Sequence, residues 1–323
     1  KYEVEGSEAR AFLDQIVANR IPNKIGGLCL AHALNPSGSV RSEFTITKLS
    51  DGKLGERFLV IGPGAAHDYD WDFLMKHAPL DGTVVLRDCT TSLGTFVVAG
   101  PNARKTLAPI SDGDLSNAAF PWLHARMLPI GFCQNVLALR VNFVGSLGWE
   151  LHHPIEYQAH LYDCIMQAGE AYGIKPVGMR AMDSMRLEKS YRLWGTDLNA
   201  ECSALEAGLD RFIAFNKGDF PGRAALLKQK EQGITKRFCT IEIDADDADS
   251  FGNEPIFIDG EVRGRATAGG YGHWVQKSLM LGYVASEYAT AGQACEVRIL
   301  DQLRPARIIA ESPYDPDNLA LRA

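Results

Sequence analysis

The 323-residue sequence lacks several features that mark particular classes of protein. No run reaches the roughly 18 apolar residues that a membrane span needs, because polar residues interrupt the longest one, residues 130–144. Lys and Arg are scattered, and the formal net charge is -7, which argues against a nucleic-acid-binding protein. We therefore expect neither a membrane nor a nucleic acid as a partner.

Paired cysteines are also missing. The seven cysteines are spread along the chain without a C-x-x-C spacing, so the sequence predicts no disulfide framework and no zinc site. It favours a reducing compartment, either the cytoplasm or, in a eukaryote, the mitochondrial matrix. We expect no metal at His152, His153 and His160, because adjacent strand residues point to opposite faces. A nucleophilic Cys–His pair stays open, but no cysteine is marked out for it.

No known phosphate-binding loop is present. The sequence has no G-x-x-x-x-G-K-[ST] stretch. Residues 62–66, GPGAA, follow a predicted strand and precede a helix, but they lack the third glycine of a dinucleotide-binding turn. A surface turn is the better interpretation.

The sequence begins at Lys1, without Met, inside a stretch that has the pattern of a folded element. We expect that an N-terminal part of the natural protein precedes it, either a targeting segment or a whole domain. What is present suits a globular protein with two or three core units, since 46% of the residues are hydrophobic and 23% are charged.

Strands and helices alternate from residue 1 to about 215, which predicts an α+β region. Expected helices cover 7–19, 157–172 and 183–194, and expected strands cover 28–34, 40–49, 57–62, 83–88, 94–99, 136–143 and 148–152. From about residue 236, short strands with Gly, Asp and Pro turns predict a small all-β barrel. A connecting helix over 219–232 gives expected boundaries of 1–216, 217–235 and 236–323.

Two carboxylates occupy unusual positions in predicted strands. Glu43 shares one strand face with two threonines, opposite an apolar face. That arrangement is typical of a solvated sheet face. Glu150, in the stretch FVGSLGWELHH, shares its face with Gly148 and His152. A planar ligand can approach a carboxylate beside glycine and donate paired N–H groups to it, but an edge-strand Glu in water is an equal explanation.

Aromatic residues near Gly-rich turns leave two interpretations open. Trp194 lies in RLWGTDL, and Tyr271 and Trp274 lie in TAGGYGHW. Such residues are often partly buried cover for a turn, and they also suit the clamping of a flat heterocycle.

Taken in order, seven stretches resemble the tetrahydrofolate-binding half of the dimethylglycine and sarcosine dehydrogenases. That half is itself similar to the aminomethyltransferase of the glycine cleavage system. The stretches are FVGSLGWELHHPIEYQAHLYDCIMQAG, AMDSMRLEKSYRLWGTDLN, LEAGL, FPGRAAL, FGNEPIFIDGEVRG, TAGGYGHWVQKSLMLGYV and PYDP. The resemblance implies a three-domain cloverleaf, with two α+β (ferredoxin-like) domains and a C-terminal small β-barrel around a central folate channel.

The resemblance also implies roles for the two acids. Glu150 matches the glutamate that ends the family's Y-T-G-E-x-G-[WYF]-E pattern and binds the pterin ring. Phe143 stands where that pattern has Tyr, which removes one polar contact with the ligand. Glu43 matches the key acid of the family, which positions a proton and stabilises a cationic iminium near folate N5 and N10.

Further positions match with less specific residues. Gly62, Gly64 and Ala65 match a turn that touches the pterin through its backbone, and Trp194 and Tyr271 match positions that line the channel.

Met182 stands where the glycine cleavage enzyme has Arg, which favours the dehydrogenase pattern.

The implied reaction is a tetrahydrofolate-dependent transfer that captures the carbon from a small methylated amine as 5,10-methylenetetrahydrofolate. FAD is expected only in an upstream domain or a partner flavoprotein oxidase. One alternative is a flavin-independent O- or S-demethylase that makes 5-methyltetrahydrofolate. A second alternative is a folate-binding scaffold without catalysis.

Overall fold

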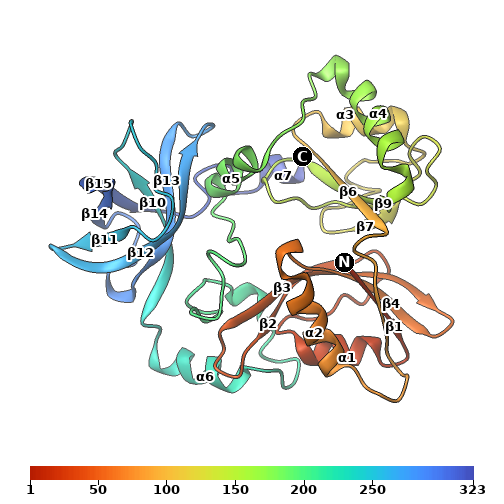
Figure 1. Ribbon diagram of the computed structural model, residues 1–323, viewed down its shortest axis with the longest axis horizontal. Coiled ribbons are helices and arrows are strands. Elements are labelled where there is room, and N and C mark those ends of the chain that lie inside the picture. Colours follow the sequence, from red (N-terminus) through yellow and green to blue (C-terminus); the bar gives the residue numbers. More distant parts are fainter.

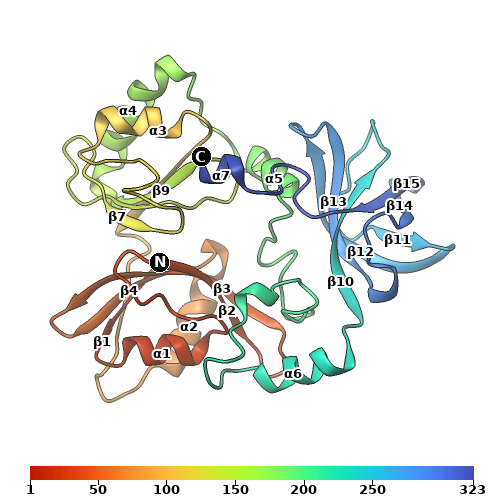
Figure 2. The same cartoon turned by 180° about the vertical axis from the view of Figure 1, so that it is seen from behind.

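The computed structural model describes residues 1–323 as two α+β units and a closed β-barrel (Figures 1 and 2), which confirms the predicted fold class. In both views the three units lie at the corners of a triangle, and the chain that follows helix α5 (Met179–Glu188) runs between them. No helix is long and apolar enough to cross a membrane. All seven cysteines are free.

The first unit is an antiparallel sheet with the order β2-β3-β4-β1-β5. Its elements are β1 (Tyr2–Gly6), α1 (Ala9–Ile16), β2 (Leu28–Leu34), β3 (Val40–Gly52), β4 (Gly55–Ile61), η1 (Gly64–Ala66), α2 (His67–His77) and β5 (Val85–Asp88). Phe44 and Ile46 of β3 share a buried core with residues of α1 and α2. Because strand residues alternate between faces, Glu43 belongs to the opposite face, as predicted.

The second unit is a four-stranded antiparallel sheet with the order β6-β9-β8-β7. Its elements are β6 (Leu93–Ala99), α3 (Ala103–Leu107), β7 (Ala125–Met127), β8 (Leu137–Leu139), β9 (Gly148–Pro154) and α4 (Gln158–Gly169). Trp149 and Leu151 of β9 lie in its core, and Leu161 and Ile165 of α4 pack there too.

The predicted strand 136–143 is wrong beyond Leu139, where β8 ends. The side chain of Asn142 replaces the strand ladder, because its Oδ1 accepts hydrogen bonds from the backbone N–H groups of Val144 and Gly145, at 3.0 and 3.1 Å. Such local side-chain bonds compete with strand pairing. Residues 140–147 are therefore a loop, and Phe143 lies in it.

The barrel closes in the order β10-β13-β12-β11-β14-β15. Its strands are β10 (Lys236–Ile243), β11 (Pro255–Ile258), β12 (Glu261–Gly272), β13 (Lys277–Ala285), β14 (Ala294–Ile299) and β15 (Gln302–Ile309), and α7 (Leu319–Arg322) follows. Helix α6 (Arg223–Gln232) precedes the barrel and begins four residues later than predicted. Gly222 directly before it has a left-handed backbone, with φ 85°, so the helix cannot begin earlier.

The predicted helix 183–194 is wrong at both ends, since α5 begins at Met179 and ends at Glu188. Ser190 adopts a left-handed conformation, with φ 56°. The N–H groups of Ser190 and Tyr191 donate to the carbonyls of Leu187 and Arg186, which is the Schellman pattern of a helix end. Glycine normally fills this position, so the sequence gives no sign of the stop.

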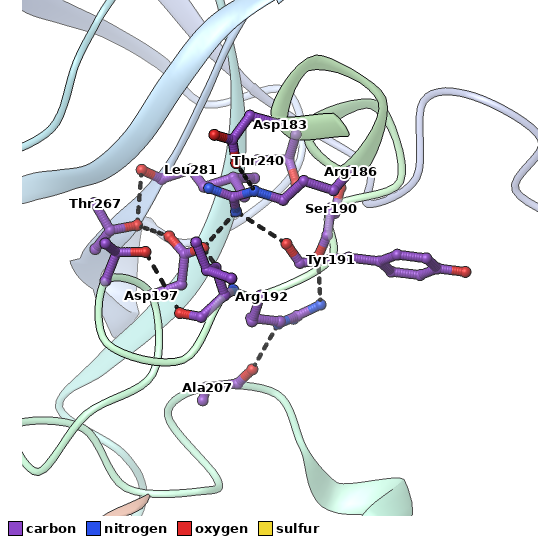
Figure 3. A network of polar contacts seen from close by, with 12 residues as sticks. Asp183, Arg186, Ser190, Tyr191, Arg192, Asp197, Ala207, Thr240, Thr267 and Leu281 are labelled. Carbon is purple, nitrogen blue, oxygen red and sulfur yellow. Dashed lines mark hydrogen bonds and ion pairs between the residues drawn. The ribbon is translucent and has the colours of Figure 1, made fainter. Parts of the chain in front are cut away.

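A buried ion pair fixes the chain after α5 (Figure 3). Arg186 Nη1 lies 2.5 Å from Asp197 Oδ2, and both side chains are almost fully buried. Asp197 also accepts hydrogen bonds from the N–H of Leu193 and the hydroxyl of Thr267 on β12. The carbonyl of Asp197 accepts from the hydroxyl of Tyr283 on β13. This network joins the segment 186–197 to the barrel.

The same segment reaches the other two units. Trp194 Nε1 donates to the carbonyl of Arg41 on β3, at 3.0 Å. The ring of Tyr191 stacks on Phe143 of the second unit, with 5.9 Å between centroids. The segment from Arg186, in the last turn of α5, to Asp197 therefore contacts all three units, and we call it the junction (residues 186–197).

We predict that Arg186→Met lowers the free energy of unfolding by about 3–5 kcal/mol, because it leaves the Asp197 carboxylate buried without its cation. Chemical denaturation followed by circular dichroism measures this effect. Lys76→Ala is the matched control, since Lys76 pairs with Asp72 at an exposed site and such pairs contribute about 0–1 kcal/mol. Equal midpoints for the two variants would contradict the role of the pair.

Candidate functional site

Glu43 lies on the face of the first sheet that does not carry the main core. Its side chain is 19% exposed, and Oε2 lies 2.9 Å from Nε2 of His32 on β2. The two residues are direct cross-strand partners in the β2–β3 register. No hydrogen bond within the protein reaches the second oxygen, Oε1. Glu43 therefore offers one carboxylate oxygen to a ligand.

Glu150 has a similar setting on the second sheet. Its side chain is 23% exposed, and Oε2 lies 3.3 Å from Nε2 of His152. Its cross-strand partner on the edge strand β6 is Val97, which is 54% exposed. Because directly paired residues share a face, the surface around Glu150 is open on the β6 side.

The two carboxylate-bearing faces meet through a small apolar cluster. Leu28 of β2 packs with Ala125 of β7 and Leu139 of β8, and Ile61 packs against them. Leu139 is the cross-strand partner of Glu150, so both lie on one face of the second sheet. Leu28 lies on the same face of the first sheet as His32 and Glu43, because strand residues alternate. Glu43 and Glu150 thus belong to facing sheet surfaces, at the contact of the two units.

The turn with Gly62, Gly64 and Ala65 begins where β4 ends. Ile61 is paired with Thr45, so the turn starts beside the end of β3 that carries Glu43. Gly64 and Ala65 are exposed, and nothing lies within 4 Å of a Cβ placed on Gly64. Gly62 differs, since a Cβ there would lie 2.7 Å from Oδ2 of the buried Asp70. Gly64 and Ala65 are therefore accessible, while the Gly62 position is filled by the protein.

Asp70 explains why the turn needs Gly62. It is fully buried on α2, and the hydroxyl of Ser42 donates to its Oδ1 at 2.6 Å. Burial raises the pKa of Asp70. Its second oxygen has no hydrogen-bond partner and faces Gly62.

The glycines of the stretch FVGSLGWELHH also serve the fold. Gly145 has φ 72°, and a Cβ on it would lie 2.3 Å from Cγ of Lys189. A Cβ on Gly148 would lie 2.7 Å from the carbonyl oxygen of Val98. The neighbouring chain therefore fills the side-chain position at both glycines, and neither leaves open space there for a planar ligand.

Lys189 is a buried cation beneath this loop. Its Nζ donates to the carbonyls of Tyr314 and Asp315, at 3.2 and 2.7 Å, and to Oδ1 of Asn318, at 3.0 Å. Burial lowers the pKa of Lys189. The amine holds the segment before α7 against the second unit.

The predicted aromatic residues fall into two groups. Phe143, half-buried, stacks on Tyr191, and the half-buried Trp194 contacts β3 through Arg41. These two lie along the junction between the units. Tyr271 lies apart, on β12, and lines a cavity of about 1160 Å³ beside the acidic loop 244–249 of the barrel. The structure therefore does not bring Tyr271 together with the two acids in one described cavity.

Sequence reasoning missed His32 and Tyr191, and it placed His152 on the strand face of Glu150 without giving it a role. The pairing of His32 with Glu43 depends on the hairpin register, and the proximity of Tyr191 to Phe143 depends on the turn at Ser190. The sequence indicates the proximity of His152 to Glu150, because residues two apart on a strand lie on the same face. No group of three or more His, Cys, Asp or Glu side chains is arranged to hold a metal ion.

Comparison with known proteins gives matches over nearly the whole chain. Residues 1–217 match the family model of the GCVT N-terminal domain, and residues 236–315 match that of the glycine cleavage T-protein C-terminal barrel domain. Dimethylglycine dehydrogenase, mitochondrial, of Rattus norvegicus is 39% identical over 315 residues, which are 96% of this chain and 36% of the relative. The chain thus spans about a third of the length of this relative.

Two further matches extend nearly end to end. Aminomethyltransferase of Thermoanaerobacter pseudethanolicus is 30% identical over 314 residues, covering 96% of this chain and 83% of the relative. The crystal structure of glycine cleavage system aminomethyltransferase T from Bartonella henselae superposes with a TM-score of 0.86, at 21% identity, over 98% of this chain and 84% of the other. The structural match supports the fold.

We predict that Gly145→Ala lowers the free energy of unfolding by about 1–3 kcal/mol, because the new Cβ meets Lys189 and the backbone is left-handed there. Thermal unfolding monitored by calorimetry measures the change. Gly64→Ala is the control and should remain within about 0.5 kcal/mol, since its Cβ enters open space. If Gly145→Ala matched this control, the packing explanation for Gly145 would be wrong.

Proposed function

The chain belongs to the glycine cleavage T-protein (aminomethyltransferase) family, and from that premise we propose that it transfers one-carbon units to tetrahydrofolate. We propose further that it captures, as 5,10-methylenetetrahydrofolate, the carbon that oxidative demethylation removes from a small methylated amine of the dimethylglycine or sarcosine type. The observation that carries this proposal is the placement of Glu43 and Glu150 on facing sheet surfaces beside one apolar cluster.

The residues present fit the chemistry of the ligand. The aminopyrimidine edge of a pterin presents adjacent N–H donors, and an ionised carboxylate only accepts hydrogen bonds. Glu150, with one oxygen free of protein partners, supplies such an acceptor. Phe143, Trp194 and the turn at Gly64 and Ala65 would line the same ligand. Tyr271 and Gly62 are further proposed ligand contacts. Tyr271 lines a cavity on the barrel, and the Cβ position of Gly62 faces the buried Asp70.

Tetrahydrofolate supplies two amine nitrogens that together carry a carbon at the oxidation level of formaldehyde. Glu43 would take up the proton that the attacking amine loses, through its free Oε1, and the carbonyl oxygen of the formaldehyde-level carbon would leave as water with the two amine protons. While it is ionised, the carboxylate would stabilise the cationic iminium. The apolar cluster around Leu28 and Leu139 keeps water from one side of the acids. Low local dielectric strengthens the interaction of Glu43 with a cation.

The N-methyl group of the amine must first be oxidised to the level of formaldehyde, and we assign that oxidation to a flavin outside this chain. We propose that FAD in a further domain or a partner flavoprotein oxidase performs it. We propose a location in the cytoplasm or, in a eukaryote, in the mitochondrial matrix; the dimethylglycine and sarcosine dehydrogenase relatives are mitochondrial.

We predict that the wild type binds tetrahydrofolate and that Glu150→Gln weakens binding by about 10- to 100-fold, because a charge-assisted hydrogen bond contributes about 1.5–3 kcal/mol. Titration calorimetry measures both. Glu156→Gln, which changes an exposed carboxylate on the following 3₁₀ helix (Ile155–Tyr157), is the control and should bind like the wild type. Absence of binding by the wild type, or equal binding by Glu150→Gln, would exclude this site.

We predict that Glu43→Gln slows formation of 5,10-methylenetetrahydrofolate by about 10²- to 10⁴-fold while binding changes little, because the variant loses proton transfer and not pterin recognition. Carbon-13-labelled formaldehyde and mass spectrometry measure the rate above the uncatalysed background. If an O- or S-methyl donor instead gave 5-methyltetrahydrofolate without flavin, the alternative reaction would replace this one. Binding without any turnover would indicate a scaffold.

A further inference from the structure

A buried histidine lies directly behind each of the two site carboxylates. His32 is 1% exposed and His152 is 2% exposed, and in each case Nε2 faces Oε2 of the acid, at 2.9 Å from Glu43 and 3.3 Å from Glu150. The two contacts arise in different ways. His32 is opposite Glu43 on the neighbouring strand, whereas His152 is two residues from Glu150 on one strand.

These histidines are the only protein groups that form hydrogen bonds with the two carboxylates. No Lys or Arg makes an ion pair with either acid. Lys1 is close enough for its charge to interact with that of Glu150, but its Nζ donates a hydrogen bond to the carbonyl of Leu93. Arg41, two residues from Glu43, lies 4.0 Å from Asp70. Each histidine is therefore the group that holds its carboxylate by a hydrogen bond.

The proton on each imidazole is assigned by its acceptor. A carboxylate accepts and does not donate, so Nε2 carries the proton toward the acid in both pairs. Nδ1 of His152 lies 3.0 Å from the hydroxyl oxygen of Thr95, which donates to it when the ring is neutral. Nδ1 of His32 is buried without a partner, beside Phe212.

An unpaired ring nitrogen at a buried position is unfavourable and calls for an explanation. The ring of His32 has one polar contact, with Glu43, so the orientation of this ring serves that carboxylate. Because Oε2 accepts from an imidazole in both pairs, it keeps one lone pair, whereas Oε1 keeps both of its lone pairs for a ligand.

We propose that His32 and His152 are positioning residues, which hold the carboxylates of Glu43 and Glu150 so that Oε1 of each faces the ligand. This inference rests on the proposed function for the separate roles of the two acids. His32 then affects the chemical step, and His152 affects binding of the pterin.

The test compares His32→Phe with His152→Phe, which keep an aromatic ring and remove the N–H. We expect His32→Phe to lower kcat by about 10- to 100-fold with the dissociation constant of tetrahydrofolate within about threefold. We expect His152→Phe to weaken binding by about tenfold or more, with kcat at saturation nearly unchanged. His32→Gln, whose amide N–H reaches the same place, should restore most of kcat.

A matched control separates positioning from loss of packing. His153 is also buried on β9, but its Nε2 contacts Gln158 and its ring stacks on Phe96. His153→Phe should lower the unfolding temperature as much as the other two variants without their separate effects on kcat and binding. If His32→Phe and His152→Phe both changed kcat and binding alike, in proportion to lost stability, the inference would be overturned.

A measurement in the absence of folate tests the histidine–carboxylate pairing independently of the proposed function. Nitrogen-15 spectra of the imidazoles should show His32 with its proton on Nε2, and Glu43→Gln should change that signal. A proton on Nδ1 would overturn the pairing. A wild type that does not bind tetrahydrofolate overturns the proposed function, whereas full turnover together with an unaffected His32→Phe overturns this inference alone.

Discussion

The buried ion pair between Arg186 and Asp197 is the constraint on which the arrangement of the molecule depends. Removing both charges from water is costly, and the structure offsets this cost with several further hydrogen bonds to the pair. The pair forces the chain after α5 into one path. From that path Tyr191 and Trp194 reach the two α+β units, so the segment that the pair holds contacts all three units.

The candidate site follows from this arrangement, because neither α+β unit contains it alone. Glu43 comes from the first sheet and Glu150 from the second, and the cluster of Leu28 and Leu139 holds the sheets in contact. Apolar contact between the sheets and polar contact at the junction thus act together.

Local sequence patterns correctly predicted the elements that begin and end at turns with a recognisable sequence. The hairpin strands over 28–34 and 40–49 were found because apolar residues alternate and a Gly-containing turn lies between them. The predicted end of the helix at residue 194 was wrong because Ser190 adopts a left-handed conformation, which is usual for glycine. Hydrogen bonds with Thr240 and Ser312 hold Ser190 in place. The predicted strand over 136–143 was too long, because the side chain of Asn142 accepts hydrogen bonds from the backbone of Val144 and Gly145 and forms a loop there.

The sequence by itself determined which residues share a strand face, and with that the placement of Glu43 and Glu150 opposite the residues that form the main cores of their sheets, because the period of two is a local property. Only the tertiary structure decided that the two faces meet and that a histidine lies behind Glu43. It also showed that Gly145 and Gly148 give space to the chain itself. Those facts depend on strand register and on contacts between distant segments, which no local pattern encodes.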